Sequence, residues 1–91
     1  MSRIFVITFY THHEAMVCFR ALQAEAGNCQ GLKITLIPVP RELSSSCGTA
    51  VKAEAELPAP HIAALLKSAG EYECCCELVD GTYHPIETAH R

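Results

Sequence analysis

The sequence predicts a single α+β domain in which strands and helices follow one another in the order β-α-β-β-α-β. Four short runs of β-branched, aromatic or alternating apolar residues are typical of strands. Two apolar stripes at helical spacing, each introduced by a helix-start signal, follow the first and the third of these runs. The chain has 91 residues, 49% of them hydrophobic, which is enough for one domain with a modest core.

The first strand is expected over residues 3–9, which are apolar on both faces, as in a central strand covered on both sides. Thr11 fits the N-cap of a helix, and Glu14 three residues later completes a capping box. The helix is expected from about residue 12 to residue 26. Its apolar stripe consists of Ala15, Cys18, Phe19, Leu22 and Ala26.

The second half of the chain supplies the remaining elements. Residues 32–37 alternate between apolar and polar and predict a half-exposed edge strand that stops at Pro38. Residues 49–55 alternate again and are assigned to a strand, although their Ala, Lys and Glu content also favours a helix. A helix introduced by two prolines is expected over residues 59–69, and a last strand over residues 73–79.

Three consecutive cysteines lie in this last strand. Strand alternation leads us to expect Cys74 and Cys76 in the core, and Cys75 on the open face between two glutamates. An Asp-Gly turn ends the strand, and residues 81–91 are expected to form a polar C-terminal tail. The ordered core of the domain should therefore span about residues 3–80 of the single domain 1–91.

The compact arrangement usual for this element order is a ferredoxin-like sandwich, an antiparallel sheet of strand order 4-1-3-2 with two helices on one face. In it, the exit of the first strand, the start of the first helix and the loop between the second and third strands meet at one end of the sheet. The chemically useful residues expected there are Thr11, His12, His13, Arg41, Ser44, Ser45, Ser46, Cys47 and Cys74.

Composition excludes several classes of function. The net charge is −3 and the basic residues are scattered, which argues against nucleic acid as a partner. No apolar stretch approaches the roughly 20 residues of a membrane span, and the N-terminus does not resemble a signal peptide, so we expect a cytoplasmic protein. Six cysteines without a CxxC pair are expected to be reduced thiols, with no metal and no cofactor. Hydrolase, kinase and dehydrogenase motifs are missing.

The segment from Pro38 to Gly48 is the longest stretch that the core does not require, and it holds the best candidate for chemistry, Cys47. A helix N-terminus, Arg41 and loop amides would lower the pKa of this thiol and favour a thiolate or persulfide. Gly48 gives the neighbouring backbone freedom, Ser46 could donate a hydroxyl, and His12 could act as a base or hydrogen-bond donor. The alternative is a plain surface loop with an unreactive cysteine.

Three segments of this sequence resemble the selenium/sulfur carrier-like family of small bacterial proteins. They are the strand end Thr8-Phe9, the helix start from Thr11 to Ala15, and above all the Pro-x-Pro-Arg to Ser-Cys-Gly segment that ends at Gly48. The resemblance spans about residues 3–70. It implies that Cys47 is the carrier cysteine, which holds sulfur or selenium as a persulfide-type adduct. It also implies donor and acceptor proteins as partners, and a carrier rather than a turnover enzyme.

Two other functions fit the residues. The chain could be a non-enzymatic interaction or regulatory module that binds through its open sheet face, with Ile37, Cys75 and Val79 outward, and forms a homodimer through the sheet. It could also be a small thiol redox protein in which Cys74 resolves a bond to Cys47. That role requires Cα atoms closer than about 7 Å.

Overall fold

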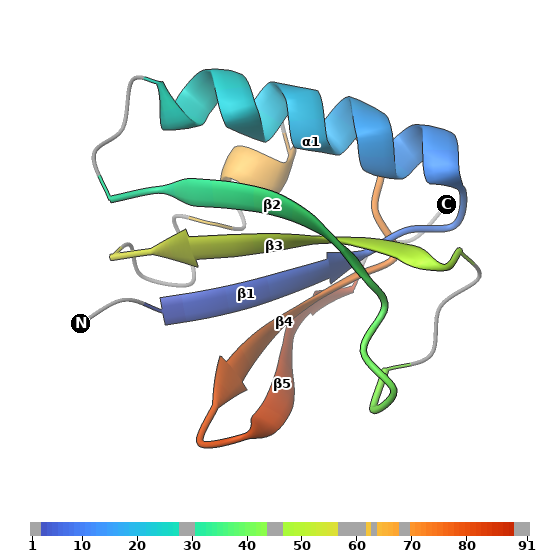
Figure 1. Ribbon diagram of the computed structural model, residues 1–91, viewed down its shortest axis with the longest axis vertical. Helices are drawn as coiled ribbons and strands as arrows, with labels where there is room; N and C mark the ends of the chain where they lie inside the picture. The colour runs from blue at the N-terminus through green and yellow to red at the C-terminus, as the bar shows by residue number, and fades with distance from the viewer. Residues whose placement is uncertain are drawn as a thin grey trace.

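The computed structural model describes residues 3–27, 31–43, 47–56, 62, 64–67 and 70–88. A five-stranded antiparallel sheet of order β2-β3-β1-β4-β5 lies beneath α1, the long helix at the top of Figure 1. Residues 62 and 64–67 are also helical. The elements are β1 (Arg3–Thr8), α1 (His12–Ala26), β2 (Lys33–Pro38), β3 (Thr49–Ala55), β4 (Cys74–Val79) and β5 (Thr82–Thr88). None of the described helices is long and apolar enough to cross a membrane.

The α+β class is confirmed, whereas the expected strand order 4-1-3-2 is not the order of this sheet. The neighbours β2–β3, β3–β1 and β1–β4 are as expected, but β5 adds a fifth strand at the outer edge of β4. The prediction of a polar tail from residue 81 is therefore wrong for β5. Asp80 and Gly81 both have positive φ, 51° and 79°, as a two-residue hairpin turn requires, and this turn returns the chain alongside β4.

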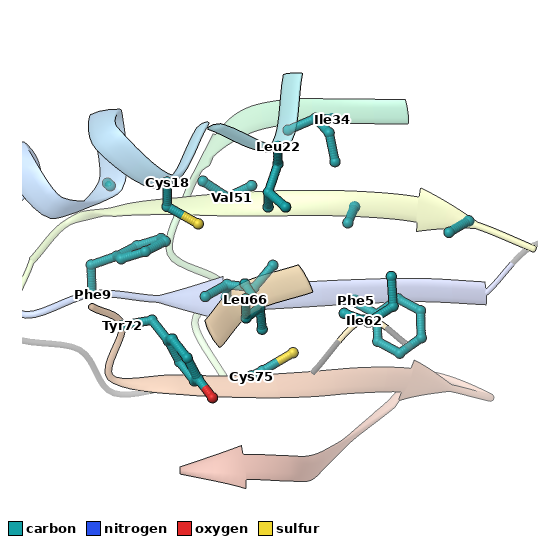
Figure 2. Packing of buried hydrophobic residues seen from close by; sticks show 14 of the residues in the cluster. Phe5, Phe9, Cys18, Leu22, Ile34, Val51, Ile62, Leu66, Tyr72 and Cys75 are labelled. Carbon is teal, nitrogen blue, oxygen red and sulfur yellow. The ribbon is translucent and has the colours of Figure 1, made fainter. Parts of the chain in front are cut away.

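A single hydrophobic core lies between the sheet and the helices (Figure 2). Both helical segments contribute to it, which places them on the same face of the sheet, as expected. The alternation expected of residues 49–55 is also confirmed, since Val51, Ala53 and Ala55 face this core. The buried members of this core are Phe5, Ile7, Phe9, Ala15, Cys18, Leu22, Leu32, Ile34, Val51, Ala53, Ala55, Ile62, Leu66, Tyr72 and Cys75.

The three cysteines of β4 alternate as predicted but in the opposite sense. Cys75 is 0% exposed and belongs to the core beneath the helices, not to the open face. The reason is register, because Cys75 pairs with Ile7, whose side chain also lies in that core. Cys76 pairs with Val6 on the opposite face of the sheet, where it is nonetheless only 2% exposed. Because the three residues are identical, the sequence does not determine which of them faces the core.

The central strand β1 is buried on both faces, as its composition predicts. Val6 and Thr8 point away from the helices and are each 2% exposed. The segment that follows β2 crosses the sheet on this side, away from the helices (Figures 1 and 2). The segment after β2 therefore covers part of the sheet face that points away from the helices, near the C-terminal end of β1.

Candidate functional site

The site begins at the N-terminus of α1, which the sequence predicts correctly. Thr11 is the N-cap, and its hydroxyl accepts a hydrogen bond of 3.2 Å from the amide of Glu14. The carboxylate of Glu14 in turn accepts from the amide of Tyr10 at 3.2 Å, one residue earlier than in a standard capping box. These bonds fix where the helix starts, and so they fix His12, the first helical residue.

Cys47 lies just before β3, and Thr49 connects it to α1. The amide of Thr49 donates a hydrogen bond to Cys47 Sγ at 3.4 Å. The hydroxyl oxygen of the same threonine lies 3.2 Å from His12 Nδ1, so a single residue contacts both the thiol and the imidazole. Cys47 is half-buried and His12 is exposed. The positive end of the α1 dipole thus lies on the same side of the molecule as the sulfur.

Two backbone hydrogen bonds shape the described part of the loop from β2 to β3. Val39 N donates to Gly48 O at 3.1 Å and so extends the β2–β3 pairing beyond the strands. Leu43 N donates to Pro40 O at 3.0 Å, which makes a turn with Arg41 exposed on it. The predicted role of Gly48 in backbone freedom does not follow from its conformation, because its φ is not positive. Ser44, Ser45 and Ser46 lie outside the described residues.

The structure joins two of the predicted residues, since His12 and Cys47 meet through Thr49. His13 and Arg41 are exposed, as His12 is. Thr49 itself is the residue that sequence reasoning missed. The sequence could have indicated it by spacing, because Thr49 comes two residues after Cys47. From that position a backbone amide can donate to the side chain of residue i, as it does in Asx and Ser turns.

Cys74 lies two strands away from the start of β3. One row of paired residues runs from Ala50 on β3 through Thr8 on β1 to Cys74 on β4. Two strand spacings of about 4.8 Å therefore separate Cys74 from Ala50, and Cys47 precedes Ala50 by three residues. The Cys74 sulfur instead lies 3.6 Å from Cys76 Sγ. Cys74 thus has a nearer thiol partner on its own strand, which argues against the predicted resolving role.

The protein's other thiols differ from Cys47 in burial. Burial raises the pKa of the Cys18 thiol to about 12. The pKa of Cys76 is also raised to about 12, first by burial and then by the hydrogen bond and charge of Cys74. All five cysteines within the described ranges are free thiols, and only Cys47 and Cys74 are half-buried rather than buried. At neutral pH, Cys18 and Cys76 are therefore unreactive toward external reagents.

No cluster of three His, Cys, Asp or Glu side chains that could hold a metal ion occurs within the part of the chain that the structure describes. The site is therefore a half-buried Cys47 thiol with an amide donor on its sulfur and the His12 imidazole linked to it through Thr49. Such a thiol can act as a nucleophile toward a sulfur atom presented by another molecule.

Comparison with known proteins places this geometry in a family. Residues 5–73 match the family described as "Putative Se/S carrier protein-like". The chain belongs to this family. The match includes His12, Cys47 and Thr49, and it ends one residue before Cys74. Neither a curated protein nor a solved structure matches the chain significantly.

Proposed function

We propose that this member of the Se/S carrier-like family accepts a sulfur or selenium atom on Cys47 and passes it to a partner protein. One observation carries the proposal: the Cys47 sulfur is half-buried, accepts a hydrogen bond from the Thr49 amide, and is joined through Thr49 to His12. A carrier needs a thiol that a partner can reach and no deep substrate pocket. The family description supports the same role.

Loading is a transfer between sulfur atoms that needs no oxidant or reductant. The Cys47 thiolate attacks the terminal sulfur of a donor persulfide, R–S–SH, and a new S–S bond forms on Cys47. The S–S bond of the donor breaks, and its electron pair leaves on the donor sulfur as a thiolate. Unloading is the same reaction with an acceptor thiolate as the nucleophile. Selenium in place of the terminal sulfur follows the same course.

The surrounding groups act on the charge of the sulfur. The Thr49 amide donates to the Cys47 sulfur and can stabilise negative charge on this atom during the transfer. His12, held by the Thr49 hydroxyl, gives or takes a proton beside the terminal atom. The proposal also includes the loop residues Arg41, Ser46 and Gly48, of which the Arg41 guanidinium would attract the anionic adduct.

The interaction-module alternative receives less support from the fold. It depends on an apolar open face that includes Cys75, and Cys75 lies in the core beneath the helices instead. Val79 shares the alternation of Cys75 and so points to the same side of the sheet. Of the three residues named for that surface, only Ile37, which pairs with Ala50, faces away from the helices.

The proposal is tested by loading the reduced protein from a cysteine desulfurase with L-cysteine as its substrate. Intact-mass spectrometry then measures the added sulfur. The wild type should gain one sulfur atom per chain and Cys47→Ser none. Cys74→Ser is the matched control, because it removes the other half-buried thiol among the described residues, and it should load like the wild type. Undiminished loading of Cys47→Ser would overturn the proposal.

A further inference from the structure

The Cys74 and Cys76 thiols form a pair that the proposed carrier role does not use. Their sulfur atoms are 3.6 Å apart on the same face of β4. Cys74 is half-buried, while Cys76 is 2% exposed. Cys75 between them points the other way, into the core. The pair also lies beyond the family match, which ends at residue 73.

An undistorted strand holds these two cysteines too far apart for a disulfide, so closing the bond needs a local change in β4 and leaves the bond strained. Residues two apart on an extended strand have Cα atoms about 6.8 Å apart, since each residue advances the chain by about 3.4 Å. Disulfides span Cα distances of about 4.4–6.8 Å, so this pair lies at the upper limit, and its Cβ atoms must approach one another from about the same spacing to about 4.5 Å. A bond at that limit stores strain, and strained disulfides are the ones that are readily reduced again.

The backbone at this position has room to adjust. A register shift between Cys75 and Cys76 places a bulge in β5, so that Cys75 pairs with Glu87 and Cys76 with Pro85. Proline has no N–H, and it therefore donates no hydrogen bond to the ladder at Cys76. Since β5 is the edge strand, Cys76 is weakly tied on that side. The bulge bends β5 and interrupts its pairing beside Cys76, so β4 is less constrained there.

We propose that Cys74 and Cys76 form a reversible dithiol–disulfide pair that exchanges with small disulfides such as oxidised glutathione. Cys74, the half-buried member, attacks the disulfide of RSSR as a thiolate, forms a mixed disulfide and releases RS⁻. Cys76 then attacks the Cys74 sulfur, closes the intrachain bond and releases the second RS⁻. The two thiols lose two protons and two electrons, and RSSR gains them as two RSH.

The order of the two steps follows from the surroundings of each sulfur. Cys76 is buried, so an external disulfide does not reach it, but the second step is intramolecular and needs no access. Part of the rise in the Cys76 pKa to about 12 comes from the hydrogen bond and charge of Cys74. Both contributions end once Cys74 is in the mixed disulfide, and Cys76 then ionises more easily.

The test uses the full chain, reduced and then incubated with oxidised glutathione. After acid quenching, free thiols are alkylated and the protein is digested with trypsin. The tryptic peptide 68–91 contains Cys74, Cys75 and Cys76 and no other cysteine. We expect it to carry one internal disulfide and one alkylated thiol, and excess reduced glutathione should restore three alkylated thiols.

Variants with a single cysteine replaced identify which two cysteines form the disulfide. Cys75→Ala should still form the disulfide, whereas Cys74→Ala and Cys76→Ala should not. Circular dichroism will show whether each variant folds. Because Cys74 is only half-buried, Cys74→Ala tests whether this cysteine is part of the disulfide even if Cys76→Ala does not fold. A mixed disulfide with glutathione as the only product, or a bond that survives in Cys74→Ala, would overturn the proposal. Cys47→Ser should oxidise like the wild type, which separates this test from that of the carrier role.

Discussion

The buried thiol of Cys18 determines how the stability of the fold should change at alkaline pH. Cys18 is 2% exposed in the core, and burial raises its pKa from 9.0 to about 12. Between these two values the folded protein holds a proton that the unfolded chain has lost. The stability that protonated Cys18 contributes is therefore complete below about pH 9, and it is lost as the pH rises toward 12.

The size of this loss follows from the two pKa values. Each pH unit between them changes the free energy of unfolding by about 1.4 kcal/mol. From pH 8 to pH 10 the wild type should therefore lose about 1.4 kcal/mol through Cys18 alone, because its thiol stays protonated in the folded state over that range. The variant Cys18→Ala has no such group. Other alkaline groups, such as tyrosine and lysine, are the same in both proteins.

The assay is urea unfolding followed by circular dichroism at pH 8 and pH 10, with a reductant present throughout. Each protein is compared with itself at pH 8, so that the cost of the small cavity left by Cys18→Ala cancels. The wild type should lose about 1.4 kcal/mol more than the variant between the two pH values. Equal losses in the two proteins, with unchanged m values, would refute the reasoning that links burial of this thiol to stability.

Three further predictions concern the core, the helix start and the site. Leu66→Ala, at a fully buried position, should lower the free energy of unfolding by about 2–5 kcal/mol in urea. Thr11→Ala removes the hydroxyl that accepts from the Glu14 amide and should cost about 0.5–2 kcal/mol in the same assay. Thr49→Val keeps the amide but loses the hydroxyl beside His12. It should slow sulfur loading about two- to tenfold, the equivalent of a hydrogen bond of about 0.5–1.5 kcal/mol, while Thr49→Ser loads like the wild type.

Local signals in the sequence predicted most of the fold. The capping residues Thr11 and Glu14 located α1, and alternation located β2 and β3. The fifth strand was missed because Pro85 and the polar residues around it are unusual in a strand, and only an edge position with a bulge accommodates them. The Asp-Gly turn before it was recognised as a turn but not as a hairpin.

The orientation of the β4 side chains could not be predicted from the sequence pattern. Three consecutive cysteines have no amphipathic signal, so the side that Cys75 faces depends on its pairing with Ile7, a long-range contact. The site was predicted only in part, because it too depends on long-range pairing. His12 and Cys47 were expected at one end of the sheet from topology, but their link through Thr49 depends on the register at the start of β3.

The central claim is that the transferred atom rests on Cys47, and the most direct test locates it in the wild-type protein. After loading, persulfides and thiols are alkylated and the tryptic peptides are sequenced by mass spectrometry. Peptide 42–52 contains Cys47 as its only cysteine. We predict that the added sulfur is found in this peptide, between Cys47 and the alkyl group. Added sulfur found instead in peptide 68–91, on the cysteines of β4, would contradict the account.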